Sequence, residues 1–419
     1  MNSVISKKIL VVAESIDVED SSGAKGRVAL IQNLYKAGFE PVVYHYTRKD
    51  INLENIRCVS MKENRRSMLF LLSRLERYIR YYLKLQLNQP LEKIFGFSFT
   101  LLNDRDSMIA ALNEVNFKPD LVFTLSKGGS FRPHHALLQI PEWHDRWVAY
   151  MHDPYPMHLY PKPYPWNEPG YKQKEEFIGK IAEKARFPVF PSLLLKEWMG
   201  QFFEGYRLKG EVIPHQVDNS YEPKGALPDY FDKKKFNLLH AGNLLQARQP
   251  QWLVQAFENF LDRVPEARKE SRLLLIGRTG HHTEYLKSMG AEHPEIIVIS
   301  ENRSFKEVSI LQENSSVNII LEAKSEISPF LPGKFAHCVK ADRPILHLGP
   351  KNSETRRLLG KEYSYTAGID EVSNISEIIE KLYFRWKKNN NLRLQRPDLE
   401  EYLSSSHLKE VVESLYEKK

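Results

Sequence analysis

The stretch FNLLHAGNLLQARQPQWLVQAFENFLDRVPEARKESRLLLIGRTG, residues 236–280, decides the fold class of this chain. It opens with an apolar run, 236–240, that reaches a turn at Gly242, and a second apolar run, 273–276, that reaches Gly277. Between the two runs, apolar side chains recur at helical spacing. The order predicts a strand, a glycine turn, a helix and a second strand, which is one β-α-β unit.

Glycine turns of this kind suit phosphate binding. Without a Cβ, the backbone N–H groups can approach a phosphate, and the N-terminus of the following helix favours negative charge. Arg248 lies between the turn and the helix. A turn that serves the fold alone would look the same, so this stretch by itself leaves both interpretations open.

The first half of the chain begins in the same way. Residues 8–13 read as a buried strand, the loop around Gly23 leads into a helical pattern over 28–37, and 41–46 is the next strand. Residues 219–235 contain two prolines, a glycine and three consecutive lysines, which is typical of an interdomain linker. Further buried strands are predicted at 119–125, 147–151, 187–190, 296–299, 317–321 and 344–348, and the stretch 211–217 closes the first half. We therefore expect an α/β protein with two similar halves.

Composition sets limits on the class of protein. The chain has 419 residues, 42% of them hydrophobic and 27% charged, which is ordinary for a globular protein of two or three domains. Its two cysteines, Cys58 and Cys338, lie far apart, which favours a reducing cytoplasm and argues against structural zinc. The apolar run at 9–13 is too short for a signal peptide, and no run is long enough to span a membrane. A net charge of +7 suits anionic substrates without indicating nucleic acid.

Residues 61–88 form a basic amphipathic segment. Seven lysines and arginines stand against two glutamates, with leucines and tyrosines between them. One interpretation places this helix as a peripheral contact on anionic lipid or facing an anionic acceptor. The other is a helix packed on the core with a solvated basic face.

Two further motifs concern the chemistry of a site. His152 follows the strand 147–151, and the carboxyl ends of parallel strands are where such sheets bind ligands. The motif Asp104-Arg105-Asp106 resembles a metal-binding DxD in form only. We interpret it as a solvated loop or a helix cap, so the sequence predicts no metal.

Five ordered segments resemble retaining GT-B glycosyltransferases of the family-4 type. They are SSGAKGRVALIQNLYKAGFEPVVY, VIPHQVD, HAGNLLQARQP, LLLIGRTG and SPFLPGKFAHCVKADRPIL, and together they cover most of the chain. The resemblance implies two Rossmann-like domains facing each other across a cleft. Residues 1–218 would form the acceptor domain and 219–386 the nucleotide-sugar donor domain, with a C-terminal helical segment, 387–419, packing back on the first.

The resemblance also implies roles for individual residues. Arg248 matches the second of two basic positions that contact the donor diphosphate, whereas Asn243 replaces the first. The family's paired glutamates are absent, with Pro329 and His337 in their places, so Lys334 would hold phosphate and His337 would contact the ribose. The implied catalytic residues are His152, Arg248 and Lys334. The implied donor-binding residues are Gly23, Gly242, Asn243, Gly277, Arg278, Glu326, Pro332, Gly333 and His337.

The function implied is a cytoplasmic enzyme of polysaccharide biosynthesis, peripheral on the inner face of the membrane if residues 61–88 contact lipid. It would move a sugar, with retention, from a nucleotide-diphosphate sugar to a glycan, lipid-linked or other acceptor, without metal or other cofactor. Two alternatives remain from the residues alone. One is a nucleotide-sugar epimerase of the same fold, and the other a nucleotide-binding protein with a degenerate site, made credible by the missing glutamates.

Overall fold

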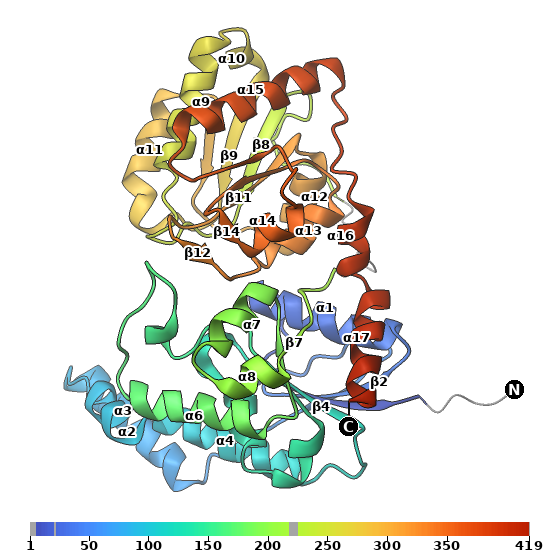
Figure 1. Cartoon of the computed structure of the whole chain (residues 1–419). Coiled ribbons are helices and arrows are strands. Elements are labelled where there is room, and N and C mark those ends of the chain that lie inside the picture. Colours follow the sequence, from blue (N-terminus) through green and yellow to red (C-terminus); the bar gives the residue numbers. More distant parts are fainter. Residues whose placement is uncertain (1–5, 21, 218–224, 419) are drawn as a thin grey trace, which may run out of the picture. The chain divides into compact units, whose positions relative to one another are not determined.

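The computed structural model describes residues 6–20, 22–217 and 225–418 (Figure 1). The chain divides into two compact units. Unit 1 comprises Met1–Tyr160, Tyr164–Asp218 and Leu403–Lys419, and unit 2 comprises Pro161–Pro163 and Asn219–Tyr402. The expected linker 219–235 falls in unit 2, and its first six residues, 219–224, lie outside the described ranges.

Unit 1 is built on a sheet of seven parallel strands in the order β3-β2-β1-β4-β5-β6-β7. Consecutive strands run outward from β1 in one direction and from β4 in the other, which is the doubly wound order of a Rossmann-like domain. The strands are β1 Lys8–Ala13, β2 Glu40–His45, β3 Arg57–Ser60, β4 Leu121–Leu125, β5 Trp147–Tyr150, β6 Phe187–Phe190 and β7 Glu211–Val212.

Helices cover both faces of this sheet, because alternate residues of each buried strand point to opposite sides. Leu10 and Val12 pack with the helices on one face, and Ile9 and Val11 pack with α1 and α17 on the other. The helices of unit 1 are α1 Ser22–Lys36, α2 Met68–Tyr82, α3 Asn88–Phe95, α4 Phe99–Leu112, α5 Arg132–Leu137, α6 Tyr171–Lys184, α7 Leu193–Gly200, α8 Glu204–Lys209 and α17 Ser405–Glu417.

Unit 2 repeats the plan with six parallel strands in the order β10-β9-β8-β11-β13-β15. The strands are β8 Phe236–Ala241, β9 Ser271–Ile276, β10 Ile296–Ile299, β11 Val317–Leu321, β13 Ile345–Leu348 and β15 Thr366–Ala367. A separate parallel pair joins β12 Ile327–Ser328 to β14 Asn352–Ser353. The direction of the strand order changes between β8 and β11, so the carboxyl ends of these two strands are the expected place for a ligand.

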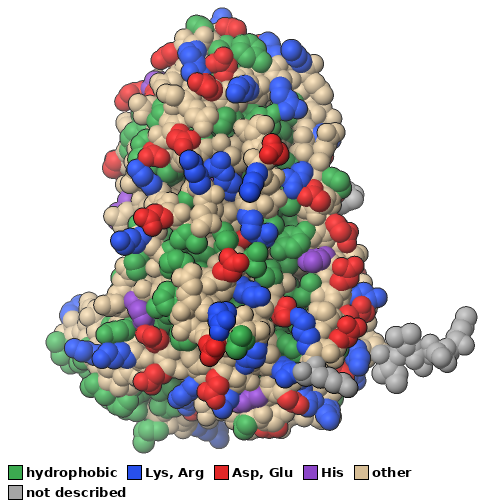
Figure 2. All heavy atoms as spheres, viewed as in Figure 1, with side chains coloured by type: hydrophobic (Ala, Val, Ile, Leu, Met, Phe, Trp, Pro, Cys, Tyr) green, Lys and Arg blue, Asp and Glu red, His purple; other side chains and the backbone are tan. Residues whose placement is uncertain are grey.

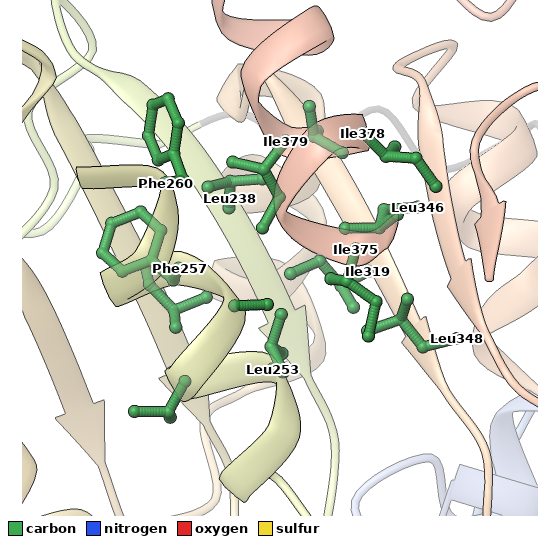
Figure 3. Close-up of a cluster of buried hydrophobic side chains, with 14 of the residues drawn as sticks. Leu238, Leu253, Phe257, Phe260, Ile319, Leu346, Leu348, Ile375, Ile378 and Ile379 are labelled. Carbon is green, nitrogen blue, oxygen red and sulfur yellow. The ribbon is translucent and has the colours of Figure 1, made fainter. Parts of the chain in front are cut away.

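One face of the unit 2 sheet is covered by α9 and α15, and Figure 3 shows their side chains meeting those of the strands. Phe257 and Phe260 of α9 and Ile375 and Ile379 of α15 are buried against residues such as Leu238. The helices of unit 2 are α9 Gln251–Arg263, α10 Ala267–Glu270, α11 Thr283–Glu292, α12 Phe305–Asn314, α13 Lys334–Lys340, α14 Glu354–Leu359, α15 Val372–Lys388 and α16 Pro397–Tyr402.

The C-terminal segment departs from the prediction. Residues 387–402 belong to unit 2, and only Leu403–Lys419 return to unit 1. Leu392 is buried in the unit 2 core, and the Arg343 guanidinium donates to its carbonyl at 3.1 Å. The predicted C-terminal helical segment contains two helices, α16 and α17, because the Ser404 side chain accepts a hydrogen bond from the His407 N–H and starts α17 there.

One smaller prediction also needs correction. The helix expected within 61–88 is limited to Met68–Tyr82. Within the described ranges, no helix combines the length and the hydropathy that crossing a bilayer requires.

Candidate functional site

The glycine turn that follows β8 is hydrogen-bonded to the end of β9 and to the turn that follows it. The Gly242 N–H donates to the Ile276 carbonyl at 2.8 Å, and the Leu244 N–H donates to the Arg278 carbonyl at 2.9 Å. Gly277, at φ +127°, lies so close that an added Cβ would come within 2.7 Å of the Gly242 carbonyl carbon. Only glycine can occupy that position without displacing the neighbouring backbone.

Asn243 ties this turn together. Its side-chain oxygen accepts a hydrogen bond from the Arg278 N–H at 3.1 Å, while the Arg278 side chain is exposed. Asn243 stands where the resembled family usually has a basic residue. Here its side chain stabilises the backbone of the two turns instead.

Lys334 places a cation beside the glycine turn. It is the first residue of α13, and its Nζ lies 3.3 Å from Nδ1 of His240, the penultimate residue of β8. A Cβ built on Gly242 would lie 3.1 Å from the same Nζ, so the ammonium sits directly over the turn. Burial, assisted by the charge of Arg248, lowers the pKa of Lys334 to about 7.

His240 is fully buried and remains neutral. Burial lowers its pKa well below the ordinary value, and the positive charges of Lys334 and Arg248 lower it further. A neutral imidazole has one free lone pair, so His240 can accept a hydrogen bond from the Lys334 ammonium. Sequence reasoning included this residue in a strand but missed it as a site residue, because its role depends on Lys334, which lies 94 residues further along the chain.

Arg248 is the second cation at this edge. Its Nε is buried, with no hydrogen-bond partner within the described part of the chain. Among those residues neither Arg248 nor Lys334 takes part in an ion pair, and both cations lower the pKa of His240. The structure thus brings the predicted residues Gly242, Gly277 and Lys334 together, and the positive charge of Arg248 acts on the same place.

A buried carboxylate lies on the neighbouring strand end. Glu322 follows β11, and its Oε1 accepts from the Thr355 hydroxyl at 2.7 Å and lies 3.4 Å from Nε2 of His347. Burial alone would raise the pKa of Glu322, but the charge and hydrogen bond of His347, with the hydroxyls of Thr355 and Ser328, outweigh it and lower the pKa. The Glu322 charge in turn favours the protonated form of Lys334, which makes it part of the same electrostatic environment.

The other predicted donor-binding residues of unit 2 are Glu326, Pro332, Gly333 and His337. Glu326 and Gly333 are exposed, and the Pro332 carbonyl accepts from the Phe335 N–H at 2.8 Å as α13 begins. The ring of His337 is half-buried and packs edge-on against Phe305 at the start of α12, with 4.9 Å between ring centroids.

His152 and Gly23 belong to unit 1. His152 follows β5, and its ring lies parallel to that of His215 with centroids 6.4 Å apart. Its Nε2 is buried without a hydrogen-bond partner in the described structure. Burial, and then the charge of Arg27, lowers the pKa of His152 well below the ordinary value. Gly23 is exposed in the first turn of α1.

Arg27 is a buried cation that sequence reasoning missed. Its guanidinium donates to the carbonyls of Ser15 and Ser126, both at 2.9 Å, just beyond the carboxyl ends of β1 and β4. It is 1% exposed, and burial lowers its pKa to about 10. A signal was present, since an arginine precedes an uninterrupted apolar run in the first helix.

The interpretation of Asp104-Arg105-Asp106 as a solvated loop or cap is wrong for Asp104. This residue lies inside α4 and is buried, because helical periodicity places it on the inner face with Met108. Its carboxylate accepts from the hydroxyl of Tyr46 and from Arg48, both at 2.9 Å, and from Arg132 at 2.7 Å. Within the described ranges, no group of three or more potential ligand side chains could hold a metal ion.

Comparison with known proteins gives no match at the level of sequence, either to a protein-family model or to a curated protein. Solved structures do match over the whole chain. An E. coli trehalose-6-phosphate structure with bound UDP-2-fluoro glucose aligns with a TM-score of 0.65 and 12% identity, covering 99% of both chains. A UDP-forming alpha,alpha-trehalose-phosphate synthase from Burkholderia xenovorans aligns with a TM-score of 0.62, 12% identity and the same coverage.

The N-terminal domain of Candida albicans trehalose-6-phosphate phosphatase aligns equally well, with a TM-score of 0.62 and 12% identity over 99% of this chain and 97% of that one. The fold is GT-B. Two Rossmann-like domains with parallel sheets agree with the prediction made from the ordered motifs. Identity this low establishes the fold and leaves the activity to be argued from the site.

Proposed function

We propose that this protein is a retaining glycosyltransferase that uses a nucleotide-diphosphate sugar. The observation that carries the proposal is the Lys334 ammonium over the glycine turn of unit 2, with the positive charge of Arg248 close enough to lower its pKa. Lys334 and Arg248 have no carboxylate partner within the described residues, and the turn lies at the switch point of the sheet, where ligands bind in this class of fold.

A diphosphate fits this chemistry. The glycine turn exposes backbone beside the Lys334 ammonium, and the Arg248 guanidinium offers a planar fork of donors to phosphate oxygens. Burial without an anionic partner disfavours the charged form of Lys334 and lowers its pKa. A bound phosphate would stabilise the charged form and raise the pKa again.

The transfer step follows from these roles. The bond between the anomeric carbon and the diphosphate oxygen breaks, and the electron pair stays on the phosphate, where Lys334 and Arg248 stabilise the developing charge. A bond forms from the acceptor oxygen to the anomeric carbon on the same face, and the acceptor proton passes to the departing phosphate. His152 is neutral, so we assign it to hydrogen bonding with sugar hydroxyls.

Structural relatives support the donor class. The E. coli structure has UDP-2-fluoro glucose bound, and the Burkholderia xenovorans enzyme is UDP-forming. A further Burkholderia xenovorans structure of 10% identity and TM-score 0.61, covering 98% of this chain and 100% of that one, contains glucose-6-phosphate. We propose a nucleotide-sugar donor and a glycan, sugar-phosphate or lipid-linked acceptor, without a resident metal or cofactor.

Calorimetric titration of UDP, GDP, ADP and CMP, without metal, tests the proposal. We expect one diphosphate to bind at micromolar Kd, and Arg248→Ala or Lys334→Ala to weaken it at least about tenfold. Lys287→Ala, an exposed cation on α11 of the same unit, is the matched control and should leave binding unchanged. Equal loss in the control, or no binding of any diphosphate, contradicts the donor site.

Product analysis then separates the enzyme classes. The wild-type protein is incubated with the matching nucleotide sugar, with and without glycan or sugar-phosphate acceptors. A transferase releases nucleotide diphosphate and forms a new glycoside only with acceptor. Conversion of the donor sugar without acceptor would identify an epimerase instead, and binding without any conversion would identify a nucleotide-binding protein.

A further inference from the structure

The helix α2 exposes its apolar side chains. Met68, Leu71, Leu75, Tyr78 and Tyr82 are each between 53% and 70% exposed, and we call them the α2 apolar stripe. At 3.6 residues per turn the five positions fall within an arc of about 80° on one side of the helix. Single exposed apolar residues are ordinary on a protein surface, but a continuous stripe marks an interaction site.

The helix is held to unit 1 by its opposite, more polar side. Ser73 is its one buried residue, and it lies about 180° from the centre of the stripe by the same geometry. Arg77 donates to the Thr100 hydroxyl of α4 at 3.1 Å, and Ser67, the N-cap, bonds to the Asn103 side chain of α4. The helix therefore packs on unit 1 without burying the α2 apolar stripe, which stays exposed to solvent.

The apolar surface continues beyond α2. Leu83 and Leu85 in the following loop and Ile94 and Phe95 of α3 are each more than half exposed. Figure 2 shows hydrophobic side chains together with Lys and Arg side chains at the lower left, where Figure 1 places α2 and α3. The stripe is thus the centre of a larger patch.

The charge around this patch is positive. Residues 62–95 carry eight basic and three acidic side chains. The Glu63 and Glu76 side chains are only 7% and 13% exposed and lie in ion pairs with arginines, so the charge presented to solvent is that of the cations. The exposed cations of this range are Lys62, Arg65, Arg66, Arg74, Arg80, Lys84 and Lys93.

We infer that this face of unit 1 docks on an anionic lipid membrane. Exposed leucines and methionine enter the acyl boundary, tyrosines suit the headgroup level, and arginines and lysines pair with lipid phosphates. A second copy of the chain fits less well, because two such faces would bring their basic side chains together. The inference goes beyond nucleotide-sugar transfer and does not depend on it.

Sedimentation of the full chain with vesicles tests the inference. The vesicles are phosphatidylcholine alone, or phosphatidylcholine with about one third phosphatidylglycerol. We expect binding to the anionic vesicles and an at least about tenfold fall in partitioning for the triple variant Leu71→Gln, Leu75→Gln, Tyr78→Gln. Leu208→Gln, an equally exposed leucine on α8 of the same unit, is the matched control and should bind as wild type does.

A second triple variant separates charge from apolar burial. The variant Arg74→Gln, Lys84→Gln, Lys93→Gln should lose binding to anionic vesicles, as added salt should also cause, whereas Lys7→Gln, Lys36→Gln, Lys409→Gln should not. Of the control lysines, Lys7 directly precedes β1, Lys36 is the last residue of α1 and Lys409 lies on α17.

Three outcomes overturn the inference. They are no binding of wild type to anionic vesicles, equal losses in the variants and their controls, and a wild-type dimer in light scattering that the apolar variant converts to a monomer. The last would identify a second copy as the occupant. Nucleotide-diphosphate affinity of the same variants should equal that of wild type, which checks folding and keeps the failure of this inference distinct from failure of the proposed function.

Discussion

Nζ of Lys334 lies 3.3 Å from Nδ1 of His240, although the two residues are 94 positions apart. The β8 strand end and the first residue of α13 meet over the Gly242 turn, and burial with the nearby Arg248 brings the pKa of Lys334 to about 7. Near neutral pH, the Lys334 ammonium is therefore partly deprotonated when no anion is bound.

The first prediction concerns the pH dependence of diphosphate binding. As pH rises from about 6 to about 8.5, through the lowered pKa of Lys334, the free protein loses that proton, and affinity for the nucleotide diphosphate should fall about tenfold per unit above the pKa. Lys334→Arg keeps a charge throughout this range and should flatten the dependence. Calorimetry in buffers of different ionisation enthalpy at pH 8 should show proton uptake on binding by wild type.

Arg272→Lys, on β9, is the control and should leave the pH profile as in wild type. A profile in Lys334→Arg as steep as that of wild type would show that another group titrates, and the assignment of the cation to Lys334 would fail.

The second prediction concerns the glycines. Gly277→Ala should destabilise unit 2 by about 1–3 kcal/mol and weaken diphosphate binding, because the new Cβ would lie 2.7 Å from the Gly242 backbone at a φ of +127°. Gly333→Ala is the matched control, since no atom lies within 4 Å of its Cβ position, and it should change stability by less than about 0.5 kcal/mol. Calorimetric unfolding and nucleotide titration measure both, and a harmless Gly277→Ala would contradict the close approach of the two turns.

Much of the fold could be predicted because parallel strands buried on both faces appear as plain apolar runs. β6, β10 and β11 span the predicted residues, and most other strands agree within one or two positions. Residues near a glycine turn could be assigned by their place in the motif, which is why Arg248 and Lys334 were both predicted, and in the structure the charge of Arg248 lowers the pKa of Lys334.

Buried charges could not be predicted in the same way. Asp104 is paired with Arg132, which lies 28 residues away, and Glu322 with Thr355, which lies 33 residues away. Whether a charged side chain points inward depends on partners that only the tertiary structure brings to it. The same limit applies to α2, whose amphipathic pattern predicts a helix but not which face meets solvent.

The third prediction concerns the buried Glu322. Its lowered pKa means that the charged form contributes stability above the ordinary value of 4.5, and that this contribution disappears as pH falls through the lowered pKa. Thr355→Val removes the hydroxyl donor at 2.7 Å, should destabilise unit 2 by about 1–3 kcal/mol at pH 7, and should make its stability less dependent on pH between about 5 and 3. Thr366→Val, at the half-buried start of β15, should do neither. Parallel pH profiles for the two variants in urea unfolding would rule out this role of the hydroxyl.

The fourth prediction separates the two aspartates of Asp104-Arg105-Asp106. Asp104→Asn should destabilise unit 1 by about 3 kcal/mol, because the half-buried Arg132 loses one of its two counter-charges and Arg48 loses a partner at 2.9 Å. Asp106→Asn, the control, makes the same substitution on a side chain that is 41% exposed. The ion pair of Asp106 with Arg105 contributes about 0.5 kcal/mol or less, so the loss should be small. Calorimetric unfolding distinguishes the units, since unit 2 should melt as in wild type in both variants. Equal shifts for the two substitutions would show that Asp104 is solvated after all. A metal-dependent shift in wild type that is lost in both variants would restore the motif as a cation site.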